Sequence, residues 1–119
     1  MTIKEKSSNQ GNYDKALEFY RKALEIVEKV HGLEHPYTAA TYNNIAVVYE
    51  AQGNYGEALK YCLMAFKVYL DKFGMKHPKT SAIYGNLKTA YCGSGKETET
   101  FCSWLLPLLD EKQRAAVLE

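Results

Sequence analysis

Cysteine and histidine are the residue types in this sequence that could bind a metal, form a disulfide or act in catalysis. The chain of 119 residues has three histidines and three cysteines, Cys62, Cys92 and Cys102. Their spacing along the chain fits neither a disulfide framework nor paired zinc ligands. No motif brings histidine, cysteine and carboxylate groups together, so no nucleophile and base can be assigned. We therefore expect free thiols, no metal, no cofactor and no enzymatic activity.

The segment Gly93-Ser94-Gly95-Lys96 has part of the composition of a phosphate-binding loop. Such a loop needs glycine where Ala90 stands and serine or threonine where Glu97 stands, and it should follow a strand. Because these requirements are not met, we interpret the segment as a turn between helices. His35 and His77, each followed by proline, are likewise interpreted as turn residues.

The strongest feature of the sequence is an internal repeat, in which residues 53–94 match residues 11–52. The two stretches have equal length and align without gaps, with one third of their positions identical. The identities fall on small, aromatic and turn residues, as a shared packing geometry requires. The chain is therefore predicted to be a short array of one structural unit.

Apolar residues recur at steps of three and four in both copies, which is typical of helices with one buried face. Glycines follow the periodic segments, where a residue without Cβ can end a helix. No segment alternates with the period of two that a strand needs. The pattern predicts an all-α chain of helix hairpins, with helices at about 13–31, 39–52, 55–73 and 80–92.

The two ends of the chain depart from the repeat, which covers residues 11–95. Residues 1–10 are predicted to be a polar N-terminal segment. Residues 96–119 are predicted to be a degenerate C-terminal helical cap. A break is expected near Pro107, because proline removes a backbone donor and clashes with the preceding turn.

The charge balance favours no electrostatic partner. Lysine and arginine number 15 against 14 aspartates and glutamates, so we expect neither nucleic acid nor an anionic membrane as partner. No apolar run approaches the roughly 18 residues of a membrane span, and the polar start lacks the apolar core of a signal peptide. The sequence therefore predicts a soluble, cytoplasmic protein.

The order of small, aromatic and turn residues resembles the tetratricopeptide repeat. The marks in the complete unit are Tyr42, Ile45, Ala46, Tyr49, Gly53, Tyr55, Ala58 and Ala65, and those in the partial first unit are Gly11, Tyr13, Ala16, Tyr20 and Ala23. The length of the repeat, Tyr-Asn-Asn-Ile-Ala-Val-Val-Tyr at 42–49, and the Gly-x-x-His-Pro links at 32–36 and 74–78 resemble the kinesin light chain type. The resemblance implies an α-solenoid of about two and a half antiparallel helix hairpins that acts as a scaffold for protein binding.

The same resemblance implies a peptide site on the shorter helices, which line the concave side in this family. Asn44 and Asn86 match the asparagine that bonds the backbone of an extended bound peptide. An amide suits this role because it offers both a donor and an acceptor to a peptide unit. By helical spacing we add Asn43, Val47, Glu50 and Thr89 to the expected peptide-binding residues.

Two apolar surfaces at the ends of the array are candidates for association. One contains Phe101, Trp104 and Leu108, in a segment that would otherwise seal the last hairpin. The other contains Tyr20, Leu24 and Val27, on a long helix whose hairpin partner is missing. The second hypothesis for function is therefore a structural, self-associating repeat unit or a fragment of a longer array, with a homodimer formed through the exposed terminal helices.

Overall fold

The computed structural model describes the backbone of residues 2–118 and the side chains of residues 11–118. Met1 and Glu119, the outermost residues of the two predicted terminal segments, lie outside this range. Within it the chain is helical and contains no strand. The elements are α1 (Thr2–His31), α2 (Pro36–Gln52), α3 (Tyr55–Phe73), α4 (Pro78–Gly93), η1 (Thr98–Thr100), α5 (Phe101–Leu105), η2 (Leu106–Leu108) and α6 (Glu111–Leu118), where η marks a 3-10 turn.

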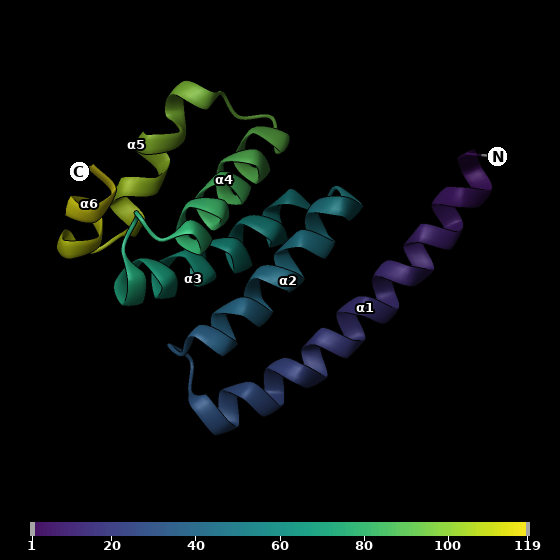
Figure 1. Ribbon diagram of the computed structural model, residues 1–119. Helices are drawn as coiled ribbons and strands as arrows, with labels where there is room; N and C mark the ends of the chain where they lie inside the picture. The colour runs from purple at the N-terminus through teal and green to yellow at the C-terminus, as the bar shows by residue number, and fades with distance from the viewer. Residues whose placement is uncertain (1, 119) are drawn as a thin grey trace.

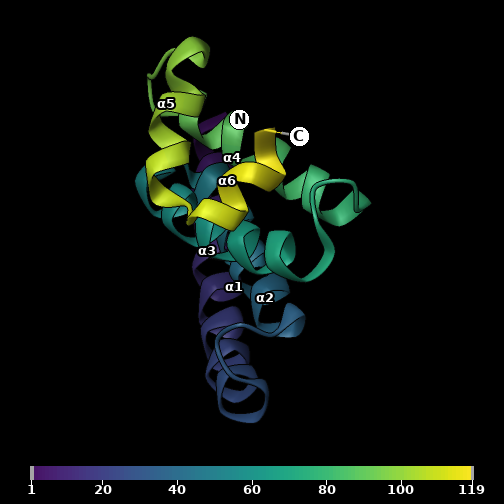
Figure 2. The same cartoon turned by 90° about the vertical axis from the view of Figure 1, so that its left-hand side faces the viewer.

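The first four helices lie beside one another in the order of the chain. α2 packs between α1 and α3, and α4 packs against α3 (Figure 1). α5 and α6 lie at the opposite end from α1, and Figure 2 views the array from that end. The chain measures 47 × 38 × 21 Å along its principal axes, so the array is flat.

α1 begins at Thr2, whereas the sequence predicts a helix from about residue 13 and a separate polar segment before it. The difference arises at Gly11. Its counterpart Gly53 ends α2 with a φ of 82°, but Gly11 is not among the glycines with positive φ and stays inside α1. Glycine inside a helix costs only about 1 kcal/mol, and no proline interrupts α1.

α2 and α4 begin at the prolines of the two His-Pro links, slightly before the predicted starts. His35 is extended, with φ of −92° and ψ of 144°, as the residue before a proline should be. Its Nδ1 accepts a hydrogen bond from Tyr37 N at 3.1 Å, and Nδ1 of His77 accepts one from Lys79 N at the same distance. Desolvation and the neighbouring His31 lower the pKa of His35, which favours the neutral imidazole that accepts this hydrogen bond. The repeated histidines are therefore helix caps.

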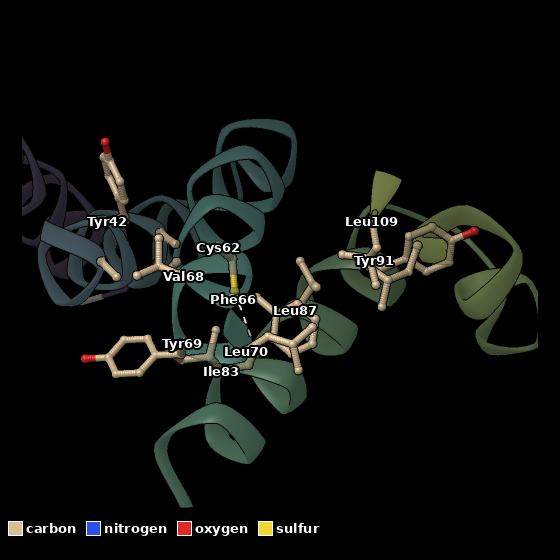
Figure 3. Packing of buried hydrophobic residues seen from close by; sticks show 14 of the residues in the cluster. Tyr42, Cys62, Phe66, Val68, Tyr69, Leu70, Ile83, Leu87, Tyr91 and Leu109 are labelled. Carbon is tan, nitrogen blue, oxygen red and sulfur yellow. Dashed lines mark hydrogen bonds between the residues drawn. The ribbon is translucent and has the colours of Figure 1, made fainter. Parts of the chain in front are cut away.

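Small residues let α2, α3 and α4 approach closely. Ala39 and Ala46 of α2 are buried in one cluster with Ala65 and Phe66 of α3. Ile83 and Leu87 of α4 complete this cluster from the other side of α3 (Figure 3). The core therefore runs through α3 and joins the repeat units.

The C-terminal cap turns at Pro107, which lies in η2 after α5 has ended at Leu105. Phe101 contacts the rings of Tyr84 and Tyr91 at 5.5 and 5.4 Å between centroids, which holds α5 against α4. Gln113 fixes α6, because its Nε2 donates to both carboxylate oxygens of Asp71 at 3.0 and 3.1 Å.

Gly11 and Gly53 occupy the same repeat position in different conformations, so the same substitution should act in opposite directions. Gly53→Ala should destabilise the fold by about 1–2 kcal/mol, because alanine is strained at positive φ. Gly11→Ala should leave stability unchanged or raise it by up to about 1 kcal/mol, because alanine favours the helix interior. Urea unfolding followed by circular dichroism measures both. A loss of stability in Gly11→Ala equal to that in Gly53→Ala would show that the chain turns at Gly11.

Candidate functional site

A hollow of about 220 Å³ lies between α2 and α4, and we call it the α2–α4 groove. Ala40 and Ala82 hold the same position in the two copies of the repeat, and their small side chains keep the space between the helices open. Tyr69 of α3 contributes to the lining from between the two helices. The lining residues are Ala40, Asn43, Asn44, Tyr69, Lys79, Ala82 and Ile83.

Asn43 carries the most informative polar atom of the groove. Its Oδ1 is buried and has no hydrogen-bond donor among the residues whose side chains are described. Leaving such an oxygen unpaired costs about 1–3 kcal/mol. The repeat does not require an amide here, because the counterpart of Asn43 is Gly85. The described part of the chain therefore supplies no donor to this oxygen.

The structure brings Asn43 and Asn44 together in the groove but does not place Asn86 there. Asn44 is exposed and lines the groove. Asn86 is half-buried on α4 and is not a lining residue. The two copies of the repeat asparagine therefore differ in their surroundings.

The three other predicted peptide-binding residues lie outside the groove lining. Val47 is 48 % exposed, on the turn of α2 that follows Asn43. Thr89 uses its hydroxyl within α4, where Oγ1 donates to Gly85 O at 2.9 Å. Glu50 is half-buried, burial raises the pKa of its carboxyl group, and the carboxylate has no hydrogen bond to residues 11–118. Of the three, only Glu50 has a partly buried charged group without a hydrogen-bond partner within residues 11–118.

Lys79 and Tyr69 line the groove although the sequence did not indicate them. Lys79 has Tyr37 as its counterpart, so the repeat comparison gave no signal for a cation at this position. The Tyr69 hydroxyl donates to Pro36 O at 3.4 Å, which ties α3 to the start of α2. Only the helical periodicity of α3 could have placed Tyr69 beneath the groove.

A larger hollow of about 370 Å³ lies where α6 meets α3 and the α1–α2 link. Three of its polar residues, Asp71, Asp110 and Gln113, are bonded to one another. Gln113 accepts from Asp110 N at 2.9 Å and bonds Asp71, while Asp110 Oδ1 accepts from Gln113 N at 2.7 Å. This reciprocal capping arrangement accounts for the side chains structurally, so we place the candidate site in the smaller groove.

The predicted association residues of α1 are not free. Tyr20 and Leu24 pack against the cluster that contains Leu17 and Ile45, and Val27 is half-buried. The expectation that these side chains lack a partner helix is wrong, because this side of α1 faces α2. The exposed apolar residues of α1 lie on a different side: Phe19, Ile26 and Val30.

The predicted association residues at the C-terminal end are also partly used within the chain. Phe101 is 1 % exposed and belongs to the core, so its assignment to an exposed surface is wrong. Trp104 is half-buried, with its ring 5.1 Å from that of Tyr91. Leu108, 39 % exposed, remains on the surface.

The cysteines do not form a reactive site with the histidines. Burial raises the pKa of Cys62 to about 12, and its thiol donates to Ile83 O at 3.6 Å. Cys92 lies beside the Thr98 hydroxyl, and Cys102 is exposed. Among the described residues no three histidine, cysteine or carboxylate side chains lie close enough together to hold a metal ion.

No helix of the described range combines the length and apolar character that crossing a membrane requires. A search of curated proteins gave no match. The family model described as tetratricopeptide repeat matches residues 8–71 and, in a second overlapping match, residues 38–99, which together cover more than half of the chain. Repeats of this kind are in general protein–protein interaction modules. With its repeated helix hairpins and these two matches, the chain belongs to the tetratricopeptide repeat family.

Proposed function

We propose that this chain is a non-enzymatic interaction module that binds an extended peptide segment of a partner protein in the α2–α4 groove. The observation that carries the proposal is the buried Oδ1 of Asn43, which lacks a donor within the described side chains. A backbone N–H of an extended peptide supplies such a donor at every residue except proline. A groove that uses this acceptor holds a main chain without requiring one particular side chain.

The other lining residues suit a main chain that lies close to the helices. Ala40 and Ala82 leave space for backbone atoms, and Asn44 offers both a donor and an acceptor at the exposed edge. Lys79 adds a positive charge on the α4 side. A peptide that places a carboxylate near Lys79 and a backbone N–H at Asn43 would satisfy both groups.

Glu50 indicates a further preference in the peptide. Its carboxylate is half-buried and unbonded within residues 11–118, and burial raises its pKa. A lysine or arginine of the partner would stabilise the charged form of this group. We therefore expect bound peptides to carry a basic side chain near Glu50, in addition to a carboxylate near Lys79.

The first test uses peptides selected from a random-sequence display library on the immobilised chain. Asn43→Ala should weaken binding of a selected peptide by about tenfold or more, since one buried hydrogen bond is lost. The same variant should be at least as stable as the parent, because it removes an unpaired buried oxygen. Fluorescence anisotropy gives the affinity and thermal unfolding gives the stability.

Asn12→Ala is the matched control, because Asn12 is exposed on α1, outside the groove. It should change neither the affinity nor the unfolding midpoint appreciably. Equal affinity of the parent and Asn43→Ala would contradict the proposed site. A marked loss of stability in Asn43→Ala would show instead that this amide serves the fold.

The raised pKa of Glu50 predicts a pH-dependent stability effect. Because the folded state binds this proton more tightly than the unfolded state, the charged carboxylate destabilises the fold at neutral pH, and this penalty disappears below the ordinary value of 4.5. Glu50→Gln should therefore raise the unfolding midpoint at pH 7, and the difference from the parent should shrink as the pH falls through the raised pKa and be absent below 4.5. The control Glu18→Gln, at an exposed position of α1, should shift the midpoint little. An unchanged midpoint for Glu50→Gln at pH 7 would refute the desolvation of this group.

A further inference from the structure

α1 exposes a row of large apolar side chains on the side that does not face α2. Phe19, Ile26 and Val30 are 67 %, 63 % and 69 % exposed, and Leu33, just after the helix, is 61 % exposed. Their sequence steps of seven, four and three place them along one side of the helix. We call these four residues the α1 stripe.

The repeat shows what kind of element covers this side of the unit. The counterparts of Phe19, Ile26 and Leu33 in the next copy are Tyr61, Val68 and Met75. Tyr61 stacks on Tyr49 of α2, with ring centroids 5.9 Å apart. Val68 is only 8 % exposed, in the cluster that contains Tyr42, and Met75 packs against that cluster. In the complete hairpin, α2 therefore helps to cover this surface of α3. The corresponding surface of α1 is open.

The edge of the α1 stripe differs in charge from the corresponding edge of α3. Lys15, Lys22 and Lys29 are exposed and follow one another at steps of seven, so they form one row along α1. Lys22 is three positions from Phe19 and four from Ile26, which makes it a neighbour of both on the helix surface. At the corresponding positions α3 carries Glu57, Met64 and Asp71. An element that covers the α1 stripe therefore meets a row of lysines, whereas the corresponding row of α3 carries two carboxylates and a methionine.

The surface next to Ile26 is both apolar and charged. A shallow hollow of about 230 Å³ is lined by Ile26, Glu25 and the two lysines Lys22 and Lys29. No hydrogen bond or ion pair joins either lysine to another residue within 11–118. Because two lysines and one glutamate surround the apolar side chain of Ile26, the hollow carries a net positive charge, and an apolar residue with a neighbouring carboxylate matches it.

We infer that the α1 stripe is a second binding surface, and that its partner is an acidic amphipathic helix of another protein. The partner places large apolar side chains at a step of seven on the stripe, as α2 does with Tyr42 and Tyr49 on α3. It carries aspartate or glutamate along the edge that meets Lys15, Lys22 and Lys29. This surface lies on α1, apart from the lining residues of the α2–α4 groove, and is independent of the peptide proposal.

A second copy of this chain fits the stripe less well. Two antiparallel copies of α1 related by a twofold axis would place the lysine row of one against the lysine row of the other, which is repulsive. α2 of another copy is unsuited because Glu50 is its one acidic residue and because its apolar sides are already packed between α1 and α3.

The test uses a synthetic amphipathic helix of about 20 residues, with leucine and tyrosine on one side and glutamate along both edges of that side. A comparison peptide has lysine in place of each glutamate. Fluorescence anisotropy should show the acidic peptide binding at least about tenfold more tightly than the basic one, with weaker binding as salt is added. Lys22→Glu combined with Lys29→Glu should reverse this preference.

Ile26→Glu should abolish binding of the acidic peptide, because it places a charge in the middle of the stripe. This residue is exposed, so circular dichroism should show an unchanged helix content. Leu118→Glu on α6 is the matched control, since Leu118 is 68 % exposed at the far end of the array, and it should bind as the parent does. Asn43→Ala should also bind the acidic peptide normally, which separates this surface from the groove.

Three results would overturn the inference. The first is equal affinity for the acidic and basic peptides, and the second is unchanged binding by Ile26→Glu. The third is a dimer in sedimentation equilibrium that dissociates in Ile26→Glu, together with no binding of the acidic peptide by the parent. This result would assign the stripe to a second copy of this chain.

Discussion

The packing of α2 on two sides is the constraint on which the rest of the structure depends. One side of α2 joins the cluster that contains Leu17 of α1, through Ile45 and Tyr49. The other joins the core of α3 through Ala39, Tyr42 and Ala46. With both sides occupied, the remaining surface of α2 carries Asn43 and Asn44, and the α2–α4 groove forms there. The groove is therefore a by-product of helix packing, and its chemistry comes from side chains that packing leaves free.

The same packing rule explains why the two ends of the array differ from its middle. A helix of the middle is covered by the helices before and after it, as α3 is by α2 and α4. Within the described chain α1 has a neighbour on one side only, and its opposite side exposes Phe19 and Ile26. At the other end, α5 and α6 are short, and Phe101, Leu105 and Leu109 close the core. Within the described chain, the α5–α6 side of the array is therefore sealed, whereas the α1 side is not.

The internal repeat was sufficient to predict the all-α fold, the repeat family and the four main helices. The small and turn residues that are the same in both copies fix the hairpin geometry. The repeat did not predict that α1 passes through Gly11. The Gly-Asn-Tyr sequence is the same in both copies, but in the described chain the first copy has no preceding helix to fold against. Local sequence could not reveal this difference, since the turn at Gly53 depends on α2 and α3 packing together.

The candidate site was predictable in part. The sequence identified Asn43 and Asn44, because both follow Tyr42 on the helix that lines the groove. It could not separate the surroundings of Asn44 and Asn86, which are identical residues at one repeat position but differ in exposure. Lys79 and Tyr69 came from two different elements, and only their arrangement in space relates them to the groove. The α1 residues assigned to an open surface were misplaced around the helix, because helical periodicity alone does not say which apolar side a neighbouring helix covers.

The position of Trp104 has a practical consequence for spectroscopy. It is the single tryptophan of the chain, and its indole lies 5.1 Å from the Tyr91 ring and 6.0 Å from that of Phe101. Its emission is therefore sensitive to the junction of α4 with α5, whereas amide absorption averages over every helix. Heating curves recorded by the two signals would coincide for a chain that melts as one cooperative unit and would separate for one that unravels from an end.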